Sequence, residues 1–403
     1  MTDLLPAYIT ESLPGVGGVC RVHLEDFYVE EIPLYPPTGT GQHTHFEIEK
    51  RGLDTPGAIR LLARDLDISS RLIGCAGLKD AHAISRQRLS VEGIAPERLM
   101  AIQYPQLIVL WAERHRNRLK IGHLRGNRFV VRIRQVLPDS LVRARAILDI
   151  LTQRGLPNGF GLQRFGSRGQ THLLGRCLVQ NDLAAFFRVY LGTPQPDDDL
   201  ETLAAREHYD AGDVPGVLRL WRTPHSDEYR ALHVLSAQNS LKAAYYSLPR
   251  ELLRLSLAAY QGYLFNRLLQ QRLLQYDRLE VGDLAYKHDN GACFVVEDAA
   301  TERPRADRLE ISPTAPLYGH KVRLASGCPG ERERALLATE GLTIENLQPR
   351  GFALDGTRRP LRVAVDDLNL SQDEEGLVVR FALPAGAYAT NLLRELMKTS
   401  DLR

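Results

Sequence analysis

The segment from residue 250 to residue 274 is the strongest helical pattern in the chain and reads RELLRLSLAAYQGYLFNRLLQQRLL. Its apolar residues are too dense to fill only one face of a surface helix, so they predict a helix that is buried on more than one side. The chain of 403 residues is also longer than one hydrophobic core usually organises. About two to three domains are therefore expected, and this helix belongs to the core of one of them.

The first third of the chain has a different texture, in which short strands alternate with a single helix. Residues 21–135 contain several strand-like runs, and the helix is expected from Thr55 onward. Thr55 can cap the first turn, Pro56 presets its backbone, and apolar residues then recur at helical spacing. A second helix is expected over residues 138–155, before a Gly-Leu-Pro stop signal.

The rest of the chain indicates how these parts are organised. The segment 192–216 is acidic and rich in Pro and Gly, which is typical of a solvated connection between helices. From residue 376 the pattern returns to a strand, a Pro-Ala-Gly turn and a terminal helix. This layout predicts a domain that is split in two by a large insertion.

Composition excludes several classes of protein. Lys plus Arg number 51 against 49 Asp plus Glu, so a nucleic-acid site would have to come from the distribution of charge. No apolar run approaches the roughly 20 residues of a membrane helix, and the N-terminus does not resemble a secretion signal. Five scattered cysteines without a CxxC pair argue against a disulfide framework or a zinc ribbon. A soluble, cytoplasmic protein is expected.

Positive charge is concentrated in one segment. Residues 114–134 read RHRNRLKIGHLRGNRFVVRIR and contain eight Arg or Lys residues and no acid. Alternate side chains of a strand share a face, so several of these cations would form a track for phosphates. The alternative is a solvated edge strand that resists aggregation. We favour the track because a basic edge usually carries compensating acids.

A Lys79-Asp80 pair lies in a glycine-containing loop, within GCAGLKDAHAISRQRLS. The runs RLIGCAG and RQRLSVEG on either side of it are typical of strands. Asp80 would then lie at a strand end, in a loop held by rigid elements, where catalytic groups are commonly found. An ordinary solvated turn is the alternative.

Two further patterns give weaker indications of chemistry. His45 and Glu47 match the H-x-E half of a zinc deaminase signature, but the same half occurs at His23 and no P-C-x-x-C follows. His43 and His45 would share a strand face and could bind a metal, yet two ligands without a third are more often ordinary polar residues. The glycines of PGVGG lack the spacing of a phosphate-binding loop.

Several separate stretches, in the right order, resemble motifs of the TruD family of RNA pseudouridine synthases. The resemblance extends over nearly the whole chain, and its specificity comes from the set, since any one stretch alone would be weak. The matching stretches are LEDFYVEE (24–31), GTGQHTHFEIEKRGLDTPGAIRLLA (39–63), AGLKDAHAISRQRLS (76–90), LPNGFGLQRFG (156–166), YLFNRLL (263–269) and FALPAGAYATNLLRELM (381–397).

The resemblance implies an α+β fold. A mixed-sheet pseudouridine synthase core would be made from both ends of the chain and would carry an inserted α/β domain, the TRUD domain. On this interpretation the discontinuous core comprises residues 1–159 and 356–403, and the insertion comprises residues 160–355.

The resemblance also implies an active site without a metal or organic cofactor. Asp80 falls on the family's catalytic aspartate, which is needed to break the N-glycosidic bond of uridine and rejoin the base through carbon. That aspartate acts on the ribose or forms a covalent adduct. Phe27, Asn158 and Phe160 fall on positions that line the site, and Tyr388 falls where an aromatic residue, commonly Phe, packs on the target base.

Arg21 and Lys79 are the two candidate cations beside Asp80. An ionised carboxylate in an aromatic pocket pays a desolvation cost that raises its pKa, unless a cation offsets that cost. Arg21 falls where the family carries a basic residue that can pair with the aspartate. Lys79 is the second candidate, and it could instead face an RNA phosphate.

The expected substrate is tRNA, and the resemblance points to conversion of uridine 13 to pseudouridine with no obligate protein partner. Two alternatives stay open, namely an RNA-binding or chaperone protein that does not use Asp80 catalytically, and a metal-dependent nucleobase enzyme. The residues expected to bind RNA are Arg114, Arg116, Arg118, Lys120, Arg125, Arg164 and Arg168.

Overall fold

The chain forms two compact units. The sheet unit comprises Tyr8–Leu156 and Val363–Arg403, and the helix-rich unit comprises Met1–Ala7 and Pro157–Arg362. The computed structural model describes residues 4–221, 223, 225–345 and 347–399. The sheet unit is thus discontinuous in sequence.

The first described residues belong to the helix-rich unit, whereas the sequence assigned them to the other part. Asn266 Nδ2 donates a hydrogen bond to the Leu4 carbonyl at 2.7 Å. The Ala7 N–H donates to the Gln270 side chain at 2.6 Å. These bonds tie the N-terminal segment to a helix more than 250 positions away, which no local pattern could indicate.

The sheet unit is built on a mixed sheet, which confirms the predicted class. Its strands run in the order β15-β16-β8-β2-β5-β3-β7-β6, with β1 beside β8 and β4 beside β5. β2 and β5 are parallel, whereas β2 and β8, β3 and β5, and β16 and β8 are antiparallel. The strands are β1 (Gly17–Cys20), β2 (Phe27–Pro33), β3 (His43–Arg51), β4 (Gly74–Cys75), β5 (Ile84–Glu92), β6 (Gln103–Tyr104), β7 (Leu107–His115), β8 (Leu124–Val136), β15 (Asp366–Asp373) and β16 (Gly376–Pro384).

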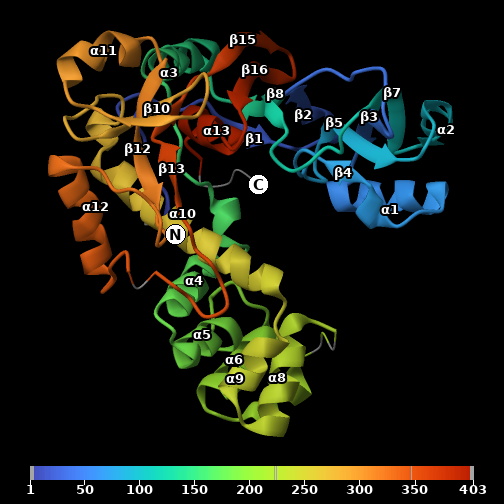
Figure 1. Cartoon of the computed structure of the whole chain (residues 1–403), viewed down its shortest axis with the longest axis vertical. Helices are drawn as coiled ribbons and strands as arrows, with labels where there is room; N and C mark the ends of the chain where they lie inside the picture. The colour runs from blue at the N-terminus through green and yellow to red at the C-terminus, as the bar shows by residue number, and fades with distance from the viewer. Residues whose placement is uncertain (1–3, 222, 224, 346, 400–403) are drawn as a thin grey trace. The chain divides into compact units, whose positions relative to one another are not determined.

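Two hydrophobic clusters hold helices against this sheet. In the first, buried side chains of α3 and α13 pack against β1, β2, β8 and β16. In the second, α1 packs against β3, β5 and β7, and Figure 1 shows α1 and α2 at this end of the unit. The helices are α1 (Thr55–Leu66), α2 (Pro96–Met100), α3 (Ser140–Arg154) and α13 (Ala389–Met397).

The predicted helix at residue 55 is confirmed, but its cap is different. Asp54, not Thr55, is the N-cap residue, and its carboxylate accepts a hydrogen bond from the Gly57 N–H at 2.7 Å. Thr55 is fully buried as the first helical residue. Its hydroxyl is therefore available for contacts outside the helix, which matter for the active site.

The helix-rich unit combines many helices with a small sheet of order β11-β10-β12-β13. Every pairing in that sheet is antiparallel, so this part is α+β rather than the α/β domain expected. A short pair, β9 (Leu156–Pro157) and β14 (Arg362–Val363), contains two of the three points where the chain passes between the units; the third lies between Ala7 and Tyr8. The other elements are α4 (Thr171–Val179), α5 (Leu183–Leu191), α6 (Leu200–Asp210), α7 (Val214–Leu220), α8 (Asp227–Gln238), α9 (Leu241–Ser247), α10 (Arg250–Gln271), α11 (Ala299–Asp307), α12 (Gly327–Thr339), β10 (Leu284–Lys287), β11 (Cys293–Val295), β12 (Ile311–Leu317) and β13 (Thr357–Pro360).

α10 is the buried helix predicted from the sequence. Its buried residues recur on more than one side and include polar Ser256 and Asn266. α4 packs closely along it (Figure 1), because Gly175 lets the two backbones approach. A Cβ atom at Gly175 would lie only 2.0 Å from the Ser256 carbonyl oxygen, which no larger residue tolerates.

The prediction that segment 192–216 is a solvated connection is wrong. Most of it is helical, because it contains α6 and the start of α7. Two of the acidic residues that suggested a loop are caps. Asp199 accepts from the N–H groups of Glu201 and Thr202, and Asp213 accepts from the Gly216 N–H.

Within the described ranges, no helix combines the length and apolar character that a transmembrane segment requires.

Substituting Leu264 by Ala tests the burial of α10. Leu264 is 1% exposed, so Leu264→Ala should lower the free energy of unfolding by about 2–5 kcal/mol through lost burial and a residual cavity. Leu255→Ala is the matched control on the same helix, since Leu255 is 53% exposed, and its effect should stay below about 1 kcal/mol. Denaturant-induced unfolding measures both, and equal effects would contradict the assigned burial.

Candidate active site

Strand pairing brings three predicted site residues to one edge of the sheet. β2 and β5 are parallel, with Tyr28 opposite Ile84, so both strands begin at the same edge. Phe27 is the first residue of β2, and Asp80 lies in the loop that leads into β5. β1 and β2 pair with successive parts of β8, so Arg21, which follows β1, also lies at this edge.

Arg21 links the two other residues. Its guanidinium carbon lies 4.3 Å from the centroid of the Phe27 ring, which is cation–π geometry. Its Nη2 lies 3.8 Å from Asp80 Oδ2. The Arg21 side chain is 13% exposed and that of Asp80 is 63% exposed. The cation is thus held in place, whereas the carboxylate is loosely paired and open to a substrate.

The backbone of Arg21 is unusual. Its φ angle is +63°, in the left-handed region that non-glycine residues rarely adopt. Such a conformation costs on the order of 1 kcal/mol and persists where the surrounding structure imposes it, often at functional sites. The strained backbone supports a role for the guanidinium that glycine could not supply.

Lys79 has a different partner from the two considered in the sequence analysis. Its Nζ donates to Glu31 Oε1 at 2.8 Å, and the two side chains are 8% and 2% exposed. Glu31 Oε2 also accepts from the Arg88 N–H at 3.0 Å. Lys79 is therefore committed to a buried ion pair, and Arg21 is the cation that faces Asp80.

Buried polar side chains hold the backbone of the loop that contains Asp80. Thr55 Oγ1 accepts from the Lys79 N–H at 2.8 Å and donates to Gln87 Oε1 at 2.8 Å. Gln87 Nε2 donates to the Gly77 carbonyl at 2.8 Å. Lys50 Nζ donates to the Asp80 carbonyl at 3.1 Å. The sequence analysis placed none of Lys50, Thr55 and Gln87 at the site, although all three stand in the stretches that resemble the TruD motifs.

Asn158 and Phe160 lie in the helix-rich unit, where two arginines surround them. The Arg359 guanidinium donates to the Asn158 carbonyl and to Asn158 Oδ1, and Asn158 Nδ2 donates to the Pro360 carbonyl at 2.9 Å. Arg359 and Arg164 lie 4.4 and 4.9 Å from the Phe160 ring centroid. The sequence analysis missed Arg359, because no motif that it quoted includes β13.

Tyr388 is the N-cap residue of α13 and follows β16 in the sheet unit. The end of β16, Pro384, is opposite Gly126, and Gly126 is opposite Ile32 of β2. Pro384 is thus level with a residue five positions along β2 from Phe27. Strand register alone does not bring Tyr388 to Asp80, and its contact with the target base stays a prediction.

The basic segment is not one continuous track, which corrects the interpretation of residues 114–134. Three of its β8 arginines meet acids from neighbouring elements, so for these three the compensation that the local sequence lacks comes from tertiary structure. Arg128 pairs with Asp367, Arg132 with Asp373, and Arg134 with Asp26. These acids lie outside the segment, so the sequence analysis did not count them.

The turn between β7 and β8 and the adjoining strand ends carry the remaining positive charge. Arg118 donates to the Arg71 carbonyl at 2.6 Å and so helps to fix this turn. Arg116, Lys120 and Arg125 are exposed. Among the residues that the structure describes, these three and Arg114 form no ion pair. Their charges are available to phosphates.

Arg164 and Arg168 were also predicted to bind RNA. Arg168 donates to the Thr193 carbonyl at 3.0 Å and pairs with Asp198 at 3.1 Å, and its side chain is 26% exposed. Arg164 packs on Phe160. Both contacts give these residues a packing role within the helix-rich unit, and RNA contact by either stays a prediction.

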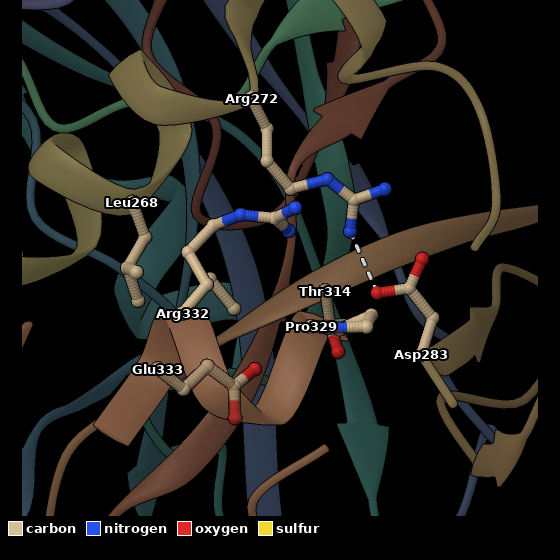
Figure 2. A pocket seen from close by; sticks show the side chains of 8 residues that line it. Leu268, Arg272, Asp283, Thr314, Pro329, Arg332 and Glu333 are labelled. Carbon is tan, nitrogen blue, oxygen red and sulfur yellow. Dashed lines mark hydrogen bonds and ion pairs between the residues drawn. The ribbon is translucent and has the colours of Figure 1, made fainter. Parts of the chain in front are cut away.

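A cavity of the helix-rich unit is also lined by charged residues. Figure 2 shows Arg272, Arg332 and Glu333 around it, with Asp283 paired to Arg272 at 2.6 Å. Burial raises the pKa of Asp283, against the Arg272 charge, which lowers it. Glu333 is bound by Arg358 at 2.7 Å outside the view. The charges of this cavity are matched by the chain itself, so it is part of the core.

Of the two histidines considered as metal ligands, His45 packs against His115 and a backbone carbonyl. His45 is buried, its Nε2 is 2.8 Å from the Asn117 carbonyl oxygen, and its ring centroid is 4.1 Å from that of His115. Burial lowers the pKa of His45 to about 4. In the described part of the chain, no group of three or more His, Cys, Asp or Glu residues is arranged to hold a metal ion.

Comparison with known proteins shows the family. The model of the family described as tRNA pseudouridine synthase D (TruD) matches residues 5–396. The chain belongs to the TruD family. It is 44% identical to the tRNA pseudouridine synthase D of Geobacter metallireducens over 393 residues, covering 97% of both chains. It is 45% identical to that of Geobacter sulfurreducens, covering 97% of this chain and 96% of the relative.

A solved TruD structure has the same fold. The crystal structure of a Methanosarcina mazei protein, described as a tRNA pseudouridine synthase D, superposes with a TM-score of 0.84 at 30% identity. The match covers 99% of this chain and 97% of the other. The α+β class is confirmed, and membership in a family of tRNA pseudouridine synthases makes this chain an isomerase.

Breaking the Arg134–Asp26 pair tests what supports the edge that carries Phe27. Asp26 is fully buried and immediately precedes Phe27, and Arg134 Nη2 lies 2.8 Å from its Oδ1. Arg134→Met should lower the free energy of unfolding by about 3–5 kcal/mol, because it leaves a buried carboxylate unpaired. The control Arg132→Met removes a more exposed pair on the same strand and should cost less than about 1 kcal/mol. Denaturant unfolding measures both.

The pH dependence has a defined sign. Burial raises the pKa of Asp26, but hydrogen bonds and charge from Arg134 outweigh burial and hold it below the ordinary value of 3.8. Ionised Asp26 therefore stabilises the fold above about pH 4, and this contribution is lost as the pH falls through the lowered pKa. In Arg134→Met this loss should begin at higher pH, so an unshifted acid-unfolding curve would contradict the assignment.

Proposed function

We propose that this chain converts a specific uridine of tRNA, uridine 13, to pseudouridine, with Asp80 as the catalytic residue. The observation that carries the proposal is the Arg21–Phe27–Asp80 arrangement at one sheet edge, in a chain that matches the TruD family over residues 5–396. The names of the relatives supply the substrate class, and the resemblance of the motifs supplies the position within tRNA.

The arrangement suits an isomerisation that involves neither oxidation nor reduction. The bond between N1 of uracil and C1′ of the ribose breaks, the base turns, and a bond forms between its C5 and C1′; C5 loses a proton and N1 gains one, so the product is an isomer of the substrate. Asp80 would attack the ribose or form an adduct during this exchange. The Arg21 guanidinium lies 3.8 Å from the Asp80 carboxylate, and the Phe27 ring gives the site an apolar wall for a uracil that has left its stack.

The charges between β7 and β8 would hold the tRNA backbone. Arg114, Arg116, Lys120 and Arg125 are the cations available for phosphate. Asn158, Phe160 and Tyr388 stay in the proposal as substrate contacts implied by the family resemblance. A tRNA substrate is consistent with a cytoplasmic location, and activity of the purified protein alone would test the expectation that no protein partner is needed.

Replacing Asp80 by Asn tests the catalytic assignment against the alternative of an RNA-binding or chaperone protein. Asp80→Asn should abolish pseudouridine formation, because the amide is not a nucleophile or base, while tRNA affinity changes by less than about threefold. Chemical mapping of pseudouridine in tRNA and a filter-binding assay measure the two quantities. Asp67→Asn is the matched control, since Asp67 is exposed at the end of α1. Modification by Asp80→Asn at the wild-type rate would refute the proposal.

A strong chelator separates the proposal from the metal-dependent alternative. The proposed reaction has no step that uses a metal ion, so the rate of pseudouridine formation should be unchanged after exhaustive treatment. Loss of activity that a divalent cation restores would favour the metal-dependent enzyme.

The salt dependence of tRNA binding tests the four cations. Single Ala substitutions of Arg116, Lys120 or Arg125 should weaken binding and reduce the slope of log affinity against log salt by about one each. Arg128→Ala is the control, because Arg128 pairs with Asp367 at 3.1 Å and with Glu30 at 3.6 Å, and its slope should equal that of the wild type. Unchanged slopes in the test variants would exclude this surface from tRNA binding.

A further inference from the structure

Lys50 is a buried cation below the proposed catalytic loop. It belongs to β3, and its exposed fraction is 0%. Its ammonium group has three N–H donors, and three backbone carbonyls accept from it: those of Leu53, Lys79 and Asp80. The bond to Asp80 is 3.1 Å, and the bond to Lys79 is weaker at 3.5 Å.

These bonds act on the two peptide planes that flank Asp80. The Lys79 carbonyl belongs to the plane before the Asp80 Cα, and the Asp80 carbonyl belongs to the plane after it. When both planes are held, the direction of the Cα–Cβ bond is set, since the peptide unit itself is planar. The carboxylate can then move only by rotation about its side-chain bonds. This suits a reacting group that must be correctly positioned and still able to meet the substrate.

The other buried contacts hold the loop but not this second plane. Thr55 binds the Lys79 N–H, and Gln87 binds the Gly77 carbonyl. The Lys79 side chain binds Glu31. Of these described side chains, Lys50 is the one that reaches the Asp80 carbonyl.

Burying an ammonium group is costly unless hydrogen bonds and opposite charges compensate. A methionine of similar length would fill the same space without that cost. Only the cation, however, offers three donors to three carbonyls, two from the Asp80 loop and one from the segment before α1. The free-energy cost of burying the Lys50 ammonium group is explained if the position of Asp80 depends on that group.

We propose that Lys50 is a positioning residue for the pseudouridine synthase reaction, in which its ammonium group sets the two peptide planes around Asp80 and so aims the carboxylate. The proposal rests on the catalytic role proposed for Asp80. Lys50 itself does not touch the substrate.

Lys50→Met is the direct test, with tRNA as substrate. The single-turnover rate of pseudouridine formation should fall by about 10- to 100-fold, because a displacement of a reacting group by about 1 Å costs that much. The dissociation constant for tRNA should stay within about twofold. A wild-type rate in Lys50→Met would overturn the proposal.

Lys398→Met is the matched control in the same unit. Lys398 also donates from its ammonium group to two backbone carbonyls, those of Thr10 and Leu13, but it follows α13 rather than the Asp80 loop. It should lower the melting temperature without changing the single-turnover rate. If both variants lost rate in proportion to their loss of melting temperature, Lys50 would be only a stabilising residue and the proposal would fail.

A pH profile provides a readout that does not depend on how Lys50→Met folds. Burial lowers the pKa of Lys50 to about 8. The positive charge of Lys79 lowers this pKa further, whereas the negative charges of Asp54, Asp80 and Glu31 raise it. Above this pH the amine loses a donor to the loop, so the wild-type rate should fall as the pH rises through about 8.

Stability should change in the opposite sense. The pKa of Lys50 is about 8 in the folded chain against 10.5 for an exposed lysine, so between these values the folded state binds fewer protons than the unfolded state. The contribution of this group to stability therefore rises with pH. A rate that stays constant to pH 9 in the wild type would overturn the proposal, whereas a fall in rate that is absent from Lys50→Met would support it.

The two proposals fail differently. If Asp80→Asn modifies tRNA normally, the catalytic assignment of Asp80 fails whatever Lys50→Met does. If Asp80→Asn is inactive and Lys50→Met is fully active, only the positioning role of Lys50 fails.

Discussion

The parallel pairing of β2 with β5 is the constraint on which the proposed site depends. Parallel neighbours begin at the same edge of a sheet, so the residue that opens β2 and the loop that leads into β5 are brought together. An antiparallel pairing would place Phe27 and Asp80 at opposite edges. Because β1 ends where β2 begins along β8, the same edge also receives Arg21. Asp80 thus meets Arg21 and Phe27 although it lies 59 and 53 positions after them in sequence.

At this edge the backbone around Asp80 is held in place, whereas the Asp80 side chain is free to move. The backbone around Asp80 is held by buried donors and acceptors from β3, α1 and β5, while the carboxylate is 63% exposed. Buried polar groups stabilise a unique conformation when each is satisfied, and they are expensive when one partner is lost. The backbone of the loop is therefore fixed by hydrogen bonds to β3, α1 and β5. The carboxylate stays free to meet a ribose, with the Arg21 guanidinium held beside it by the Phe27 ring.

Charge in this protein can be interpreted only after pairing is known. Residues 114–134 carry no acid, yet Arg128, Arg132 and Arg134 meet carboxylates from β15, the turn after it and the segment before β2. Such pairs form across strands, so a local count of charges overestimates the cations available to RNA. The opposite error occurred at 192–216, where Asp199 and Asp213 suggested a loop but instead cap helices. In both places the partner, rather than the residue type, decides the role.

The sequence by itself determined the class of fold, the buried helix at 250–274, the strands on either side of the Lys79-Asp80 loop, and the family, because periodicity and ordered motifs are local properties of the chain. Only the tertiary structure decided that Arg21 rather than Lys79 faces Asp80, and that Lys50 lies beneath the loop. These contacts depend on burial and on bonds between distant strands. Glu31, for example, forms an ion pair with Lys79, and Arg21 pairs with Asp80 instead. Hydrogen-bond partners of that kind leave no periodic signal in the sequence, so the chain must fold before they exist.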